Sequence, residues 1–209
     1  MKKKQKRNKR VILIIGTIIV LIAIIAVICF GYFHKGDRGF FATIPTVTIE
    51  TPQKINKDCT EIIDLNVEIS TLEENLYPAA SFCISFDPSK LEFVGIKEGT
   101  VRITDSRSSS GYQLPTWSVN VEKSNEIGQI NLMYLDMTGG KYAFTKEALD
   151  ETENVLFHLC FRLRGSAKKG DIYELCLEDA IFANVEEEKS LAMTTNTLET
   201  ENGRIVVGE

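Results

Sequence analysis

The sequence predicts an all-β domain of the sandwich type, preceded by one N-terminal transmembrane helix. Three observations lead to this prediction. The chain has an apolar run from Val11 to Phe30, many short alternating segments after residue 45, and turn residues between those segments. Alternation of apolar and polar residues is typical of strands with one buried face, and such strands pack face to face to bury their apolar sides.

The apolar run comes first in the chain and predicts a membrane anchor. About 20 apolar residues suffice to cross roughly 30 Å of hydrocarbon as a helix. Seven Lys or Arg residues precede the run within residues 1–10, and basic flanks stay on the cytoplasmic side. We therefore expect a cytoplasmic tail (1–10), a signal anchor (11–33), a linker (34–44) and an extracellular domain (45–209). A cleaved signal peptide is the alternative, but its apolar region is usually shorter and ends in small residues.

The charge of the chain limits its partners. The net charge is −5, and the first ten residues carry seven positive charges and no acidic residue, so residues 11–209 carry −12. An acidic domain repels phosphate backbones, which argues against nucleic acid as a partner.

The expected strands follow one another along the domain. The clearest has Ile63, Leu65, Val67 and Ile69 alternating with polar residues. We expect the others at 46–50, 81–86, 113–121, 129–136, 157–164, 172–177 and 204–207. Outside the membrane run, only 146–153 is expected to form a brief helical turn.

Residues suited to catalysis or metal binding are scarce. The chain has two histidines, His34 and His158, and the Cys residues lack C-x-x-C spacing. Carboxylate runs at 73–74 and 186–188 are typical of solvated loops. Asp136 and the Gly-rich turn after it are compatible with calcium binding, but a plain strand-ending turn explains them equally well. We expect neither an enzyme nor a bound cofactor.

Several segments together resemble bacterial cohesin modules. These segments are YPAASFCISFDPSKLEFVGI (77–96), INLMYLDMTGG (130–140), YAFTK (142–146), FAN (182–184) and NGRIVV (202–207). Their order and spacing carry the resemblance, which covers roughly 45–208. It implies a nine-stranded jelly-roll sandwich without catalytic activity that docks a protein partner, the dockerin module of polysaccharide-degrading enzymes.

The resemblance also implies a binding face. Carried over by position, this face presents Ser81, Cys83 and Ser85 from the third strand, Leu132 and Tyr134 from the sixth and Glu178 from the eighth. The alternating pattern agrees for the third strand. In the sixth strand Met133 and Leu135 are apolar too, so the pattern leaves its inward side open. Ser81 stands where many cohesins have an acidic residue, so a partner other than a dockerin stays open as well.

The family's strand order also bears on the cysteines. The resemblance makes the strands of Cys83 and Cys176 neighbours, which predicts a cross-strand disulfide, with free thiols as the alternative.

Two other functions remain open at this point. The same sandwich is a candidate for direct carbohydrate binding, for which Tyr112, Trp117 and Tyr134 are the only aromatic trio in one region. Trp117 is the lone tryptophan, and a core position is the alternative for it. A structural role in a cell-envelope assembly is the third candidate.

Overall fold

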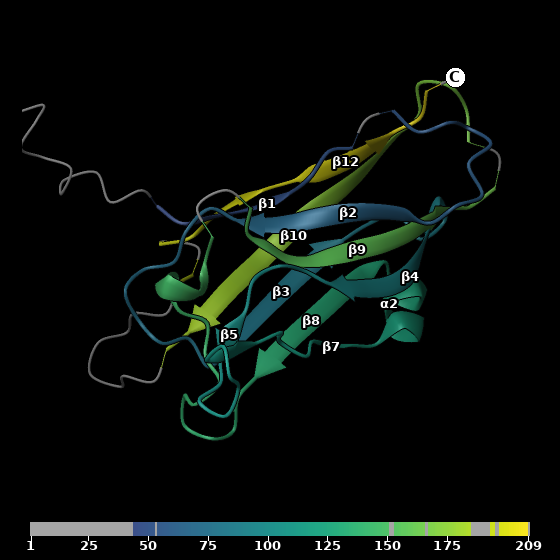
Figure 1. The fold of residues 1–209 in the computed structure, drawn as a ribbon. Helices are drawn as coiled ribbons and strands as arrows, with labels where there is room; N and C mark the ends of the chain where they lie inside the picture. The colour runs from purple at the N-terminus through teal and green to yellow at the C-terminus, as the bar shows by residue number, and fades with distance from the viewer. Residues whose placement is uncertain are drawn as a thin grey trace, which may run out of the picture. The chain divides into compact units, whose positions relative to one another are not determined.

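Two five-stranded sheets pack face to face in the computed structural model, which describes residues 44–52, 54–150, 153–165, 167–184, 193–194 and 197–208 (Figure 1). The strand order is β11-β1-β2-β9-β4 in the first sheet and β12-β10-β3-β8-β7 in the second, and β5 and β6 form a separate pair. The predicted all-β sandwich is confirmed for this part of the chain.

The structure describes twelve strands in these residues. Their bounds are β1 (Thr46–Ile49), β2 (Ile63–Ile69), β3 (Ala79–Ser85), β4 (Leu91–Glu98), β5 (Ile103–Thr104), β6 (Tyr112–Gln113), β7 (Ser118–Val119), β8 (Gln129–Leu135), β9 (Val155–Leu163), β10 (Ile172–Ala183), β11 (Glu199–Glu201) and β12 (Gly203–Val206). The prediction was nine strands. The structure has three more, because the expected strand at 113–121 is split into β6 and β7, and because β5 and β11 were not expected.

Residues of alternating character form the central strands as predicted. In β2 and β3 the apolar side chains are buried at every second position, and the residues between them are exposed or half-buried. The register between β3 and β8 places Phe82 opposite Leu132 and Ile84 opposite Ile130, so buried residues meet buried residues across the ladder. Each sheet therefore has one face that belongs to the core.

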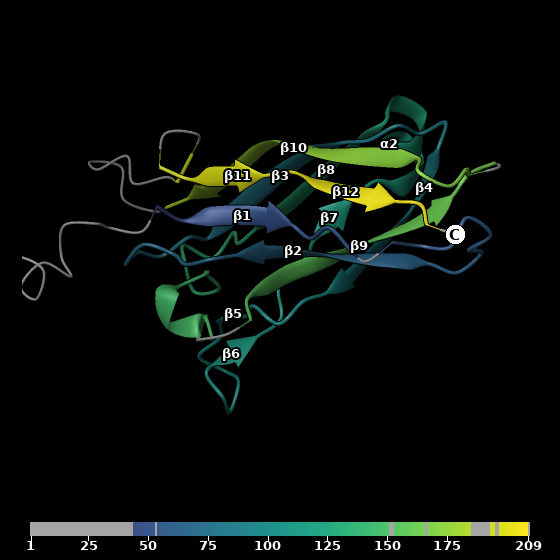
Figure 2. The same cartoon turned by 90° about the horizontal axis from the view of Figure 1, so that it is seen from above.

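The two sheets come together along the side where β11, β1 and β12 run, as Figure 2 shows from above. Gly203 of β12 packs closely here, since a Cβ atom at this position would collide with Ile49 of β1. A glycine is therefore required for the edges of the two sheets to approach one another.

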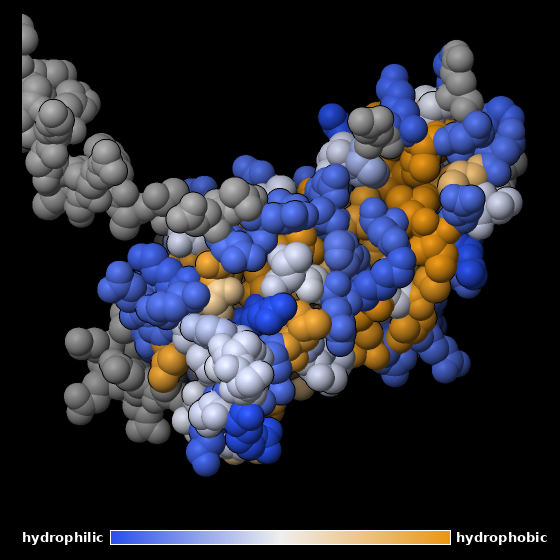
Figure 3. All heavy atoms as spheres, viewed as in Figure 1, coloured by the Kyte–Doolittle hydropathy of each residue, from blue (hydrophilic) through white to orange (hydrophobic). Residues whose placement is uncertain are grey.

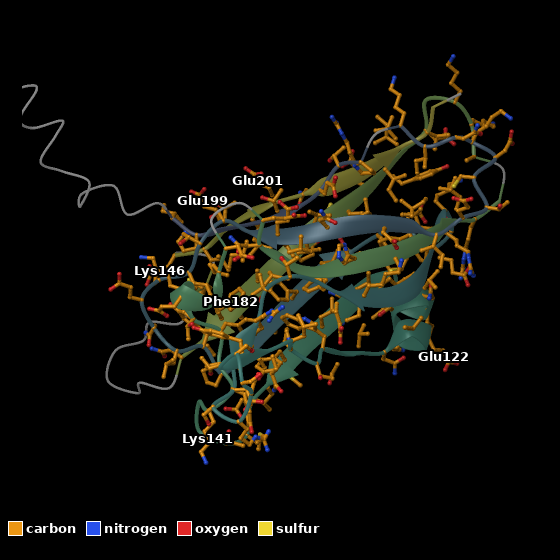
Figure 4. All side chains as sticks on the ribbon, viewed as in Figure 1. Glu122, Lys141, Lys146, Phe182, Glu199 and Glu201 are labelled. Atoms are coloured by element: carbon orange, nitrogen blue, oxygen red, sulfur yellow. The ribbon has the colours of Figure 1, made fainter. Side chains whose placement is uncertain are left out.

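A cluster of aromatic rings fills the core between the sheets. The ring of Phe82 lies 5.3 Å from that of Phe157 and 5.7 Å from that of Phe182, both edge to face. Trp117 packs 5.1 Å from Phe157 and stacks on Phe144 at 5.7 Å. Figure 4 labels Phe182, whose side chain is fully buried. Aromatic rings in these arrangements contribute more than their buried area alone.

One helix was not predicted. The strand expected at 113–121 is wrong as a single element, because the structure has β6, β7 and then helix α2 (Val121–Ile127). The Asn120 side chain caps this helix by accepting from the Lys123 amide at 2.9 Å, and Gly128 ends it in the left-handed conformation. The brief helical turn expected at 146–153 is present as the shorter η1 (Lys146–Ala148).

The predicted tail (1–10), anchor (11–33) and linker up to residue 43 lie outside the described residues. Within the described ranges, no helix is long and apolar enough to cross a membrane. Residues 44–209 form one compact unit.

Candidate functional site

The outer face of the second sheet is the candidate site, and β3 runs through its centre. Ser81, Cys83 and Ser85 are half-buried on the outer side of β3, while Phe82 and Ile84 point into the core. The structure thus places these three residues on the outer face, where they were predicted. Small side chains keep the centre of this face low and accessible.

In strand β8 the residues that were predicted to face outward face the core instead. Leu132 and Tyr134 are 2% and 6% exposed, so their predicted place on the outer face is wrong. Tyr134 packs 5.1 Å from the ring of Phe144 and donates its hydroxyl hydrogen to the carbonyl of Tyr142 at 2.8 Å. The physical reason is the register with β3, because Leu132 and Tyr134 lie opposite the buried Phe82 and Ala80.

The exposed residues of β8 are those between the predicted ones. Asn131, Met133 and Leu135 point outward, and Met133 and Leu135 are 50% and 52% exposed. Sequence reasoning missed these residues. The polar Gln129 and Asn131 were the available signal, because they share the outward phase.

Strand β10 supplies carboxylates to the same face. Glu178 is exposed, and its Oε1 accepts a hydrogen bond of 2.7 Å from Ser85 Oγ. The register with β3 shifts between Leu177 and Asp179, so that Asp179 lies opposite Cys83. The structure therefore brings the predicted Ser85 and Glu178 into contact and adds Asp179, which the sequence did not indicate.

A groove of about 630 Å³ crosses this face. Side chains from β3, β7, β8 and β10 line it, among them Ser81, Cys83, Asn131, Met133 and Asp179. We name the surface the docking face and define it by the outward residues Ser81, Cys83, Ser85, Asn131, Met133, Leu135, Glu178 and Asp179.

The loop after β8 is held by one carboxylate. Asp136 accepts hydrogen bonds from the amides of Thr138 (2.9 Å), Gly140 (2.9 Å) and Tyr142 (3.2 Å) and from the Thr138 hydroxyl (2.6 Å). Burial disfavours its ionised form, but these hydrogen bonds outweigh it and lower the pKa of Asp136. The carboxylate therefore holds the turn by accepting these hydrogen bonds, and the geometry supports a strand-ending turn over calcium binding at Asp136.

The aromatic trio considered for carbohydrate binding is not assembled. Trp117 is 9% exposed and, like Tyr134, belongs to the core. Tyr112 lies on β6 and lines a different hollow together with Arg102 and Glu147. The candidate aromatic platform is not formed, because two of its three rings pack between the sheets, and Trp117 takes the core position that was its alternative.

The predicted disulfide between Cys83 and Cys176 is not formed, and both thiols are free. Their strands are neighbours, as predicted, but Cys176 lies opposite Ser85 and Cys83 lies opposite Asp179. Diagonal positions of this kind are about 7–8 Å apart between Cα atoms, which exceeds the reach of a disulfide.

The outer face of the first sheet differs from the docking face. At its centre Asp64 forms an ion pair with Lys97, and His158 Nδ1 lies 2.9 Å from Asn66 Oδ1. Burial, followed by a hydrogen bond to Asp64, raises the pKa of the Cys160 thiol to about 11, which makes it a poor nucleophile. Figure 3 shows hydrophilic residues over much of this side and hydrophobic ones over the ends of β9 and β4.

In the described part of the chain, no group of three His, Cys, Asp or Glu side chains is placed to hold a metal ion.

Comparison with known proteins gives a family match and a structural match. The family model of the cohesin domain matches residues 45–201. No curated protein matches the chain.

Solved cohesin structures are similar in fold. The third cohesin of ScaC from Acetivibrio cellulolyticus, solved with the ScaB dockerin, has a TM-score of 0.58 at 16% identity and covers 79% of this chain and 99% of its own. The sixth cohesin of scaffoldin B from the same organism, solved with a Cel5 dockerin, gives 0.55 at 19% identity with the same coverage. A cohesin in a type I cohesin–dockerin complex from Clostridium thermocellum gives 0.55 at 18% identity, again covering 79% and 99%.

Proposed function

The chain belongs to the cohesin family, and we propose that its docking face binds a dockerin module. Cohesin modules are binding domains without catalysis, and this membership confirms the prediction that the chain is not an enzyme. The observation that carries the proposal is the composition of the face. Met133 and Leu135 stand half-exposed beside a groove that also presents hydroxyl, amide and carboxylate groups. Apolar anchors surrounded by hydrogen-bonding groups are typical of protein recognition surfaces.

We further propose that the module works at the cell surface. The support is in the sequence, where the apolar run 11–30 follows a basic tail. The chain then holds its dockerin outside the cell, and a dockerin-bearing enzyme of polysaccharide breakdown is the partner that we propose. Protease treatment of intact cells tests the location, since an extracellular domain is digested while residues 1–10 stay protected.

Carbohydrate binding by the same sandwich has less support. Of the three aromatic residues required for a platform, only Tyr112 is accessible. A single ring stacks one sugar and provides little affinity along a polymer. We therefore propose docking of a protein as the one function of this face.

Calorimetric titration of the full-length chain with a panel of recombinant dockerins tests the proposal. The variant Ser81→Arg places a long charged side chain at the centre of the face, and we expect it to weaken binding about 100-fold, which corresponds to ~3 kcal/mol. Thr48→Arg is the matched control, because Thr48 is half-buried on the outer side of β1 in the other sheet. Equal binding by both variants, or no binding to any dockerin, contradicts the proposal.

A further inference from the structure

A second hollow, of about 520 Å³, lies outside the docking face, beside η1 and the β5–β6 pair (Figure 2). The connection from β4 to β5, the residues Tyr112 and Leu114, and the segment 147–150 line it. It shares no lining residue with the groove of the docking face. We propose that this hollow binds one neutral sugar unit, the end of a glycan chain, independently of the protein partner.

The polar side chains of the hollow carry charges of both signs. Arg102, Glu147 and Asp150 are exposed, and none of their charged groups has an ion-pair partner among the described residues. An anionic ligand would meet two carboxylates here, and a cationic ligand would meet the guanidinium. A sugar hydroxyl donates to a carboxylate and accepts from a guanidinium at the same time, so a neutral ligand with several hydroxyls can pair with all three side chains.

Tyr112 supplies a surface for the apolar face of a sugar ring. Its side chain is half-buried, and Leu114, Ala148 and Leu149 add to the apolar part of the lining. One aromatic ring stacks one sugar unit, which is why we expect the end of a chain and not a stretch of polymer. An amino-acid zwitterion would also match both charges, but it lacks the ring that stacks on Tyr112, and ion pairs at an exposed site contribute little.

Hydrogen bonds hold the lining in place without a ligand. The amides of Thr100 and Val101 both donate to the Val155 carbonyl, at 2.7 and 2.9 Å. Asn154 fixes the backbone of Asp150 twice, because its Oδ1 accepts from the Asp150 amide at 2.7 Å and its Nδ2 donates to the Asp150 carbonyl at 3.0 Å. A site that is already ordered loses less entropy when a ligand binds. Its volume also lies within the range of about 300–1,000 Å³ that is usual for small-molecule sites.

Saturation-transfer NMR of the full-length chain tests this inference, in a detergent that has no sugar headgroup. The probes are glucose, galactose, mannose, xylose and N-acetylglucosamine, and free glycine and leucine serve as zwitterionic comparisons. We expect saturation to reach the ring protons of at least one sugar and to reach neither amino acid. Absence of transfer to every sugar, or transfer to the amino acids alone, would overturn the inference.

Three variants locate the bound sugar. Tyr112→Ala removes the stacking ring and Glu147→Gln removes a charged acceptor, so each should weaken binding about tenfold. Tyr112→Phe keeps the ring and should bind within about twofold of the wild type. Glu122→Gln is the matched control for Glu147→Gln, because Glu122 is exposed on α2, outside the hollow. Glu147→Gln changes an exposed side chain without an ion pair, so it tests the inference even if Tyr112→Ala unfolds. Unchanged sugar binding by Glu147→Gln and by every folded Tyr112 variant overturns the inference.

The sugar and a dockerin should bind independently of one another. Ser81→Arg should leave sugar binding unchanged, because Ser81 lines only the groove of the docking face. Sugar binding that is lost in Ser81→Arg would mean that the sugar occupies the docking face, which overturns the inference and leaves the docking function in place. A chain that binds sugar through Tyr112 but binds no dockerin overturns the docking function and supports the inference.

Discussion

Replacing Tyr134 by alanine should destabilise the domain strongly, because the structure places this residue in the core. The ring lies 5.1 Å from Phe144 and 6.0 Å from Trp117, and the hydroxyl donates to the Tyr142 carbonyl. Removing a buried aromatic side chain costs about 3–5 kcal/mol. For a domain of this size each kcal/mol lowers the melting temperature by ~2–4 °C, so the expected loss is roughly 6–20 °C.

Two further variants give stability losses with which the loss for Tyr134→Ala can be compared. Tyr134→Phe keeps the ring and leaves the Tyr142 carbonyl without its donor, so we expect a loss of about 1 kcal/mol. Met133→Ala removes a half-exposed side chain from the opposite side of the same strand, and its cost should stay within about 0.5 kcal/mol.

Urea unfolding followed by Trp117 fluorescence measures all three variants, since the lone tryptophan packs against Tyr134. The free energies of unfolding should rank wild type and Met133→Ala together, then Tyr134→Phe, then Tyr134→Ala. If Met133→Ala lowers the free energy of unfolding more than Tyr134→Ala does, then Met133 faces the core and Tyr134 faces outward. The residues assigned to the docking face on β8 would then be wrong.

Three further predictions concern buried groups that titrate. Tyr77→Phe should leave stability unchanged or raise it by up to about 1 kcal/mol, because the buried hydroxyl finds no partner among the described residues; a larger loss in urea unfolding would contradict this. Burial raises the pKa of both Tyr77 and Tyr134 to about 12. The unfolded chain releases these protons near pH 10. Stability should therefore be complete below about pH 10 and fall between pH 10 and 12, and urea midpoints that stay constant from pH 9 to 11 would refute this. Cys160, whose pKa burial raises to about 11, should alkylate more slowly at pH 8 than Cys59 in the folded chain, as peptide mass spectrometry can measure; equal rates would contradict the buried position.

The strands in which polar residues occupy every second position could be predicted from the sequence, together with the side of each strand that faces the core. In β2 and β3 every second residue is polar or small, so only one face can enter the core. The outward positions of Ser81 and Cys83 follow from this alone. The family resemblance added the order of the strands, and the family match bears the resemblance out.

Strand β8 shows where this reasoning stops. Residues 132–135 are apolar on both sides, because one side fills the core and the other stays free on the surface. Periodicity cannot separate a core side from an apolar outer side. Leu132 and Tyr134 were therefore assigned to the outer face in error, and their neighbours in β8 are the residues that belong to the docking face.

Other features depend on geometry that a sequence pattern does not contain. The register shift between Leu177 and Asp179 brings Asp179, instead of Glu178, opposite Cys83, and the register places Cys176 opposite Ser85. Helix α2 has only seven residues, so its periodicity is short, although Asn120 and Gly128 are ordinary cap signals that were available.

Protection of Cys83 by a bound dockerin tests the central claim most directly. Cys83 is a free, half-buried thiol that lines the groove of the docking face, and Cys59 is a free thiol that lines a separate hollow beside Arg162. The account predicts that a saturating dockerin slows alkylation of Cys83 at least tenfold and leaves the rate at Cys59 unchanged. A dockerin that binds while Cys83 reacts at its free rate would contradict it.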